Sequence, residues 1–291
     1  MATPSRLTLL KLTDRLNLGE TGLSVSPFCL GRVRSPETIP AAFEAGINFF
    51  FLTADLHWPL YEESRRGLEM LLARGPKVRR QIVVAVTIYP TQPEFCSMGL
   101  QEVLTAVPRL GAVDVAVAGG AYAHEFLTRL SVYQDHRRSG FAGVRAIGAS
   151  FHDRQAALLG VNHGLVDIAF LRYNPSHSGA ARDVFPHLEK QSATLLYNFK
   201  STHGYVRPER FAALGLSDDH WQPRITDWYR FALTRPELDG LLCSPSTPEE
   251  IAELSVALEE GPLDAEEENY LIDLARLNEG RARLLPGELQ N

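Results

Sequence analysis

Apolar runs alternate with amphipathic segments along most of this chain. Residues 46–53 read Gly-Ile-Asn-Phe-Phe-Phe-Leu-Thr, and a near-continuous apolar run of this length is typical of a strand buried on both faces. The preceding segment, residues 35–45, is predicted to be a helix with Ser35 as its N-cap. The polar residues Asp55 and His57 follow the strand, so they are expected near its C-terminal tip.

The same unit, a helix followed by a buried strand, recurs along the sequence. Buried strands are predicted at residues 27–31, 46–53, 81–87, 113–118, 143–149, 166–171, 193–199 and 238–243. Helices are predicted at residues 35–45, 62–73, 99–110, 121–138, 153–161, 180–190 and 226–234, then after the N-caps Thr247 and Asp264 as far as residues 259 and 278. A short hairpin is predicted at residues 15–26, with its turn at residues 19–22.

Strands and helices in this order predict an α/β fold. Because each unit spans about 30 to 40 residues, the pattern favours a (β/α)8 TIM barrel with an N-terminal hairpin and an extra C-terminal helix. No linker composition divides residues 1–291, so a single domain is expected. A doubly wound sheet is the alternative, but it would bring a GxGxxG phosphate turn, and the sequence has none. Chemistry in a barrel lies at the C-terminal strand ends.

Composition and charge narrow the classes of function. The 291 residues carry a formal net charge of −6 without a long basic patch, so nucleic-acid binding is not expected. No apolar run reaches the roughly 18 residues that span a membrane. The three cysteines form no CxxC pair, which fits a reducing compartment and predicts a cytoplasmic location. The expected partner is a small-molecule ligand, and the sequence leaves open whether a protein partner exists.

Several stretches resemble the aldo-keto reductases. LGETGLSVS at residues 18–26, followed by Leu30-Gly31, resembles the opening hairpin and first strand of that family. Further similar stretches are AAFEAGINFF at 41–50, Thr53-Ala54-Asp55, RAIGAS at 145–150, Tyr173-Asn174, Tyr197 and STPEEI at 246–251. The resemblance covers residues 16–277. It implies the barrel and carbonyl reduction with NADPH, in which a tyrosine donates the proton with help from a lysine, an aspartate and a histidine.

The positions that the resemblance assigns to these four catalytic residues carry other side chains. The aspartate falls on Leu52, the tyrosine on His57, the lysine on Ile88 and the histidine on Gly119. Tyr61 is near enough along the chain to take the place of the tyrosine. A shift of one residue either way around Ile88 does not recover the lysine. The resemblance therefore implies the fold of a reductase without its standard proton-donating group.

The positions that would bind the cofactor are also altered. Ser150 is kept among the residues that would contact the nicotinamide amide, whereas Phe170 replaces a glutamine. Tyr197 keeps the aromatic residue that would stack on the nicotinamide. The 2′-phosphate positions carry Ser244 and Glu250, and a carboxylate there repels a phosphate. No cofactor is therefore favoured; NAD(P)H remains possible, with NADH penalised less because it lacks that phosphate.

Polar residues after the strands are candidates for a replacement chemistry. Asp55 and His57 are two residues apart, so on an extended strand end they would face the same way. A near-neutral reference pKa suits His57 as a general acid or base; a histidine that only lines the site is the alternative. Lys200 could bind a ligand or form a Schiff base, or it could simply be solvated. Tyr173 and Asn174 are further candidates for ligand contact.

Other histidines also follow predicted strands: His124, His152, His177 and His203. Converging histidines and aspartates at a barrel mouth could hold a metal ion. No HxH or HExxH spacing supports such a site, and loop histidines are commonly solvated. No metal is therefore predicted.

The leading hypothesis is a divergent aldo-keto-reductase-like barrel that has lost the reductase machinery. It would bind a small, fairly apolar ligand in the barrel mouth, either for non-redox acid/base chemistry through His57 or, as a pseudoenzyme, for no chemistry. The second hypothesis is an NAD(P)H-dependent oxidoreductase in which His57 or Tyr61 donates the proton. The third is a non-catalytic binding or scaffold protein.

Overall fold

Eight parallel strands form a closed barrel in the computed structural model, which describes residues 6–55, 57–189 and 193–280. Neighbouring strands follow the order β10-β3-β4-β5-β6-β7-β8-β9. Their bounds are β3 (Phe28–Leu30), β4 (Phe49–Thr53), β5 (Val83–Ile88), β6 (Val115–Ala121), β7 (Ala146–Phe151), β8 (Ile168–Arg172), β9 (Leu195–Phe199) and β10 (Gly240–Cys243). The predicted (β/α)8 TIM barrel is confirmed.

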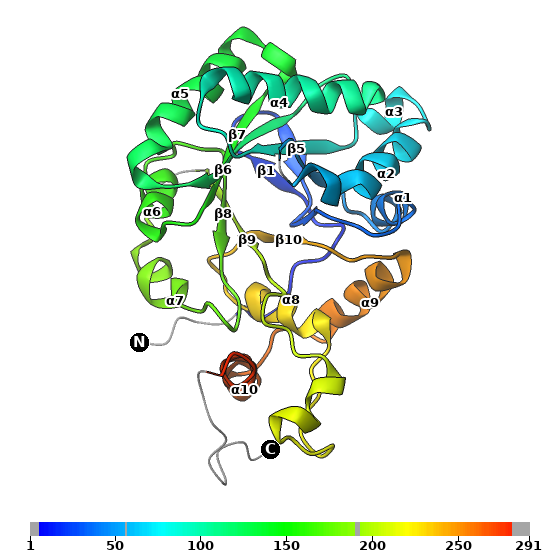
Figure 1. The fold of residues 1–291 in the computed structure, drawn as a ribbon, viewed down its shortest axis with the longest axis vertical. Helices are drawn as coiled ribbons and strands as arrows, with labels where there is room; N and C mark the ends of the chain where they lie inside the picture. Colours follow the sequence, from blue (N-terminus) through cyan, green and yellow to red (C-terminus); the bar gives the residue numbers. More distant parts are fainter. Residues whose placement is uncertain (1–5, 56, 190–192, 281–291) are drawn as a thin grey trace.

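Helices surround the barrel (Figure 1). They are α1 (Thr38–Glu44), α2 (Glu62–Leu72), α3 (Pro76–Arg79), α4 (Pro93–Ala106), α5 (Ala123–Ser139), α6 (Arg154–Asn162), α7 (Ala180–Asp183), α8 (Ile225–Leu233), α9 (Pro248–Glu259) and α10 (Ala265–Asn278). The predicted N-caps at Thr247 and Asp264 are confirmed, because each side chain accepts backbone N–H bonds from the first turn of its helix. The extra C-terminal helix is α10.

Some predicted helix bounds are wrong. Ser35 is not an N-cap: α1 begins at Thr38, and the carbonyl of Ser35 instead accepts the N–H of Thr38 in a preceding turn. The helix predicted at residues 99–110 begins at Pro93, which suits a first turn because that turn needs no N–H there. The helix predicted at 180–190 shortens to α7 and a 3-10 turn, Phe185–His187, that contains a proline. Residue 190 lies outside the described residues.

Alternate residues of each strand face the barrel interior and the surrounding helices. In β4, Phe49 and Phe51 face inward, whereas Phe50 and Leu52 pack outward in the core beneath the helices. The antiparallel hairpin of β1 (Leu16–Leu18) and β2 (Leu23–Val25), which was predicted, packs its apolar side chains on the interior cluster. The hairpin therefore closes the N-terminal end of the barrel and leaves the C-terminal end available for a site.

A side-chain oxygen before every second barrel strand accepts a backbone N–H from the preceding strand or its lead-in. The four bonds join Asn48 to Ser26 N (2.7 Å), Asp114 to Val84 N, Asp167 to Ile147 N and Asp239 to Leu196 N (each 2.8 Å). These bonds satisfy donors near the starts of buried strands. Burial raises the pKa of Asp114 and of Asp167, so their carboxyl groups are held there at an electrostatic cost.

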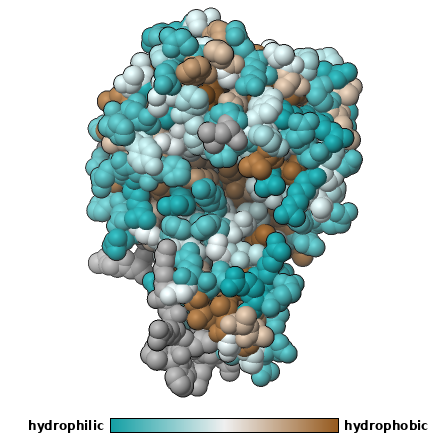
Figure 2. All heavy atoms as spheres, in the orientation of Figure 1, coloured by the Kyte–Doolittle hydropathy of each residue, from teal (hydrophilic) through white to brown (hydrophobic). Residues whose placement is uncertain are grey.

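The surface of the molecule is more polar than its interior. The face in Figure 2 is mostly hydrophilic, with apolar residues in small groups. Among the helices of the described residues, none combines the length and the apolar character needed to cross a membrane.

The bond between Asp167 and Ile147 can be tested by paired substitutions. Asp167→Ala is expected to lower the free energy of unfolding by about 1–3 kcal/mol, because it leaves the buried N–H of Ile147 without an acceptor. Asp167→Asn is expected to lower the free energy of unfolding much less, because an amide oxygen can accept the hydrogen bond, as that of Asn48 does before β4. Urea denaturation of both variants measures this; equal losses would contradict the assignment.

Candidate ligand site at the C-terminal end of the barrel

A cavity of about 420 Å³ opens at the C-terminal end of the barrel. Its floor is formed by inward-facing aromatic residues of three strands, Phe51, Phe170 and Phe199. The rings of Phe51 and Phe170 meet edge to face with their centroids 5.4 Å apart. Phe51 and Phe170 thus give the cavity an apolar surface. The two-residue period of the strands was the signal for this role.

Polar and cationic side chains form the rim above this floor. Arg32 follows β3, Ser150 is the penultimate residue of β7 and Lys200 follows β9, and all three line the cavity. The Ser150 hydroxyl accepts the N–H of Gly120 at 2.9 Å. His152 also lines the cavity; burial lowers the pKa of its imidazole, and Lys200 and Arg172 lower it further. The predicted contacts of Ser150 and Lys200 are therefore geometrically possible.

His57 and Asp55 lie together after β4, but not as an extended strand end. His57 precedes the 3-10 turn Trp58–Tyr61 and has φ −88° and ψ −1°, so the extended geometry expected from the sequence is wrong. The turn still places Nδ1 of His57 3.4 Å from Oδ1 of Asp55. The Asp55 carboxylate accepts the N–H of His57 at 3.1 Å and the N–H of Tyr89 at 2.9 Å. Asp55 therefore joins two loops at the rim.

Tyr61 and Tyr89 contribute hydroxyl groups to the same cavity. Burial raises the pKa of Tyr61, with additional effects from Tyr89, Cys29 and Asp55 that exceed the lowering effect of Arg32. Burial also raises the pKa of Tyr89. Both phenols therefore stay protonated at neutral pH and can donate hydrogen bonds to a ligand.

The positions that the resemblance assigned to the catalytic lysine, aspartate and histidine do not present side chains to the cavity. Leu52 and Ile88 pack outward, in the core between barrel and helices. Thr53, one residue later, is the inward-facing residue at the tip of β4. A Cβ on Gly119 would lie 2.8 Å from Oγ1 of Thr87 and 3.0 Å from the ring of Tyr89, so these two side chains occupy the space that a side chain at 119 would need.

Tyr197 and Tyr173 are not among the described residues that line the cavity. Tyr197 is fully buried in the barrel, and its hydroxyl donates to the carbonyl of Ser26 at 2.7 Å, beside the hairpin. The Tyr173 hydroxyl accepts from Nε of Arg235 at 2.9 Å, on the helix side of β8. Ligand contacts predicted for these two tyrosines do not fit the geometry. Phe199 is the aromatic residue that β9 presents to the cavity.

Asn174 acts behind the rim and not inside the cavity. It is buried, and its Nδ2 donates to the carbonyl of Lys200 at 2.8 Å. Lys200 has φ +56°, a left-handed conformation that costs a non-glycine residue about 1 kcal/mol or more. The predicted direct contact of Asn174 with a ligand is therefore replaced by a positioning role, because Asn174 holds the strained residue whose side chain reaches the rim.

The loop after β10 is where the resemblance places the 2′-phosphate of NADPH. Oε2 of Glu250 accepts the N–H of Ser246 at 2.7 Å, at the N-terminal end of α9. Backbone N–H groups at a helix N-terminus are the usual donors to a phosphate. Here a carboxylate of the chain itself already uses such a donor, and its charge repels a phosphate. The residues present do not fit this part of NADPH.

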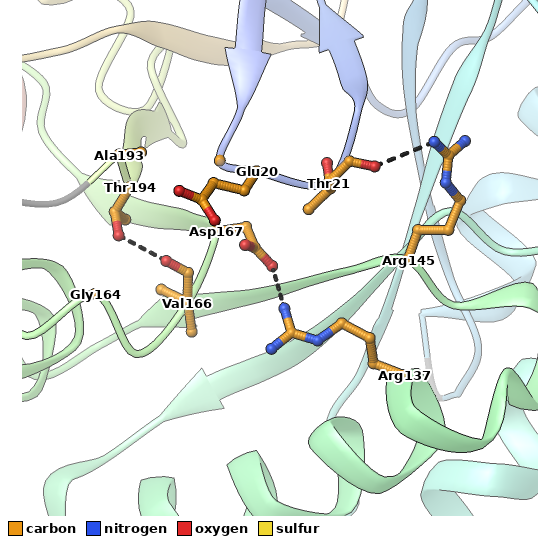
Figure 3. A pocket seen from close by; sticks show the side chains of 10 residues that line it. Glu20, Thr21, Arg137, Arg145, Gly164, Val166, Asp167, Ala193 and Thr194 are labelled. Atoms are coloured by element: carbon orange, nitrogen blue, oxygen red, sulfur yellow. Dashed lines mark hydrogen bonds and ion pairs between the residues drawn. The ribbon is translucent and has the colours of Figure 1, made fainter.

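A second cavity, of about 500 Å³, lies at the opposite end of the barrel (Figure 3). Its polar groups pair with one another: Arg137 lies 3.1 Å from Asp167, and Arg145 donates to the carbonyl of Thr21 at 3.1 Å. In TIM barrels the N-terminal face serves stability, whereas chemistry lies at the C-terminal face. The cavity above Phe51, Phe170 and Phe199 is therefore the candidate site.

Comparison with solved structures agrees with this arrangement. An aldo-keto reductase from Bacillus halodurans, in its holo form, matches with a TM-score of 0.67 and 14% identity over 94% of this chain and 98% of its own. A Pseudomonas aeruginosa protein assigned to the same group matches with a TM-score of 0.62 and 16% identity over 86% and 96%. A thermostable aldo-keto reductase solved with the inhibitor epalrestat gives 0.65 and 16% over 90% and 99%. This chain has the aldo-keto reductase fold.

Comparison of the sequence itself with known families and proteins gives no match. No protein-family model and no curated protein matches the sequence. Identities of 14% to 16% to aldo-keto reductases establish the fold alone. Fold does not determine activity, so the function has to be argued from the cavity itself.

Packing between Tyr89 and residue 119 can be tested directly. Gly119→Ala is expected to lower the free energy of unfolding by about 1–3 kcal/mol, because its Cβ would crowd both Oγ1 of Thr87 and the Tyr89 ring. Gly31→Ala is the control, since its Cβ would first meet the end of a flexible leucine side chain, at 3.2 Å. In a double-mutant cycle, Gly119→Ala should lower the free energy of unfolding less in the Tyr89→Ala background than in the wild type. Strictly additive losses would contradict the contact.

Proposed function

We propose that the barrel mouth binds a small organic ligand with an apolar body and an acidic group. We further propose that His57 acts on this ligand as a general acid or base in a reaction without hydride transfer. The observation that carries the proposal is the division of the cavity into an aromatic floor and a cationic rim. Apolar walls with a few placed polar groups are typical of small-molecule sites. Arg32 and Lys200 supply the partners for an acidic group.

His57 is the best-placed residue for proton transfer. Its Nδ1 is buried on the side of Asp55, which leaves Nε2 as the nitrogen available to a ligand. Its ring also rests against Tyr89, with the two centroids 4.9 Å apart. The Asp55 carboxylate, 3.4 Å from Nδ1, orients the ring so that Nε2 can exchange a proton with a ligand. Tyr61 would act beside it as a hydrogen-bond donor.

Nicotinamide-dependent carbonyl reduction is the second candidate, favoured by the fold shared with a holo-form aldo-keto reductase. Two observations weigh against it. Glu250 accepts the backbone N–H of Ser246 at the position that the resemblance assigns to the phosphate. The pKa of Tyr61 is raised, whereas a proton-donating tyrosine of this chemistry needs a cation that lowers it. We therefore favour a non-redox reaction at this site. If His57 proves inactive, the site would bind a ligand without chemistry.

The environment proposed for the protein is the cytoplasm. Cys29, Cys96 and Cys243 are all buried as free thiols. Burial raises the pKa of Cys243 to about 12, so this thiol is not an activated nucleophile. Unpaired cysteines support a reducing compartment.

Binding of aromatic carboxylates tests the proposed site. We expect phenylacetate-type acids to bind and their uncharged amides to bind about tenfold more weakly, because the amide loses the ion pair with the rim. Lys200→Met should reduce affinity for the acids by roughly threefold to tenfold, as expected for a partly exposed charge. Lys77→Met, at an exposed position away from the cavity, is the control. Calorimetric titration gives these affinities, and equal binding of acids and amides would refute the cationic rim.

The same calorimetry with NADPH, NADP+, NADH and NAD+ separates the functions. Tight NADPH binding would overturn the proposal and revive carbonyl reduction. Binding of NADH alone would keep a redox role without the phosphate. If neither nicotinamides nor organic acids bind, the non-catalytic scaffold hypothesis is favoured.

Acid binding should also depend on pH through His152. Burial lowers the pKa of this imidazole in the free protein, and a bound carboxylate raises it, so binding takes up a proton. Affinity is therefore expected to rise as pH falls from about 8 to about 6, where the carboxylate stays ionised. His152→Gln should flatten much of this trend, because glutamine does not titrate. An unchanged pH profile in this variant would contradict the role of His152.

A further inference from the structure

Two histidines and a glutamate from distant parts of the chain meet outside the cavity. The imidazole nitrogens of His177 and His203 and the carboxylate oxygen of Glu279 all lie within 4.8 Å of one another. The two imidazole rings are 5.2 Å apart, centroid to centroid. His177 follows β8, His203 follows β9, and Glu279 caps the C-terminal end of α10.

The loops are built to bring the two histidines together. Oδ1 of Asn174 accepts the N–H of His177 at 2.9 Å, and Nδ2 of the same side chain donates to the carbonyl of Lys200 at 2.8 Å. That carbonyl also accepts the N–H of His203 at 3.1 Å. Gly204 permits the close approach, because a Cβ there would lie 1.9 Å from Oγ of Ser176. The side chain of one buried asparagine thus fixes both histidine-bearing loops.

The third ligand group also has a fixed position. The connection after β9 already contacts α10, since the hydroxyl of Tyr270 donates to the carbonyl of Trp221 at 2.8 Å. Glu279 sits at the C-cap of α10, where the helix dipole is negative. A carboxylate in that position is electrostatically unfavourable, and a cation held beside it offsets both the carboxylate and the dipole.

We propose that His177, His203 and Glu279 bind one divalent metal ion of the Zn²⁺ class. Two neutral imidazoles and a carboxylate are a ligand set that Zn²⁺ uses with water in the fourth position. Metal–ligand bonds of about 2.0–2.1 Å place tetrahedral ligands about 3.3 Å apart, so side-chain shifts of about 1 Å complete the site. A carboxylate with two imidazoles suits Zn²⁺ better than the oxygen-only ligand sets of Ca²⁺ and Mg²⁺.

The ion would join the loops after the neighbouring strands β8 and β9 to the C-terminal end of α10. Lys200, Ser201 and Thr202 line the cavity and directly precede His203. Metal binding at His203 would therefore fix the rim of the candidate site against α10. The proposal rests on the geometry of the cluster and is independent of the ligand proposed for the cavity.

Titration of untagged, metal-free protein with ZnCl₂ tests the site. We expect one Zn²⁺ per chain, a higher melting temperature in excess Zn²⁺, and, with CoCl₂, the visible absorption of a four-coordinate Co²⁺ site. Affinity should fall in acid, because protons compete with the metal ion for imidazole nitrogens. Absence of Zn²⁺ binding near neutral pH would overturn the proposal.

Substitutions locate the ion within the protein. His203→Ala and Glu279→Gln should each weaken Zn²⁺ binding by about tenfold or more, since each removes a first-sphere ligand. His203 is exposed, so its variant is expected to keep the fold. His124→Ala, at another exposed histidine after a strand, is the matched control and should bind as the wild type does. Wild-type affinity in both ligand variants would show that Zn²⁺ binds elsewhere and would refute the site.

Discussion

The closed parallel barrel requires its interior to be filled, and this requirement shapes both ends of the molecule. Alternate residues of every strand point inward, so large side chains there pack in layers. Phe49 and Tyr197 form part of the lower packing, with their ring centroids 5.9 Å apart, and the hairpin closes the barrel beneath them. Phe51 and Phe170 stand one layer higher and end the packed interior. The cavity exists because nothing larger than Thr53 follows Phe51 on the inward face of β4.

The side chains at the two ends of the barrel make different kinds of contact. At the N-terminal end, side-chain oxygens before alternate strands satisfy backbone donors, and the charged groups there pair with one another. At the C-terminal end, loops present cationic and phenolic groups toward a common space. The Asp55 carboxylate makes a comparable bond at this end, where it accepts the N–H of Tyr89. This bond holds two loops of the rim together. The residues that make these bonds at the N-terminal end are thus different from the residues that line the cavity.

Local patterns were enough to predict the barrel, the hairpin and the caps at Thr247 and Asp264, because each depends on residues a few positions apart. The orientation of Tyr197 was out of reach, because it depends on how far the strands are staggered around the barrel. Sequence alone also could not show that Tyr89 fills the space beside Gly119, since these residues belong to different strand ends. Phe51 could have been placed at the cavity from the alternation within β4, had the inward face been known. The functional meaning of His57 remains a prediction.

Strain at Lys200 connects the cavity to the end of α10. A left-handed lysine persists only where neighbouring groups hold it, and here Asn174 and the N–H of His203 both bond to its carbonyl. One acceptor therefore fixes the residue that presents a cation to the cavity and the residue that faces Glu279. The position of the Lys200 charge at the cavity rim therefore depends on bonds from Asn174 and His203, two residues that are not among the described residues lining the cavity.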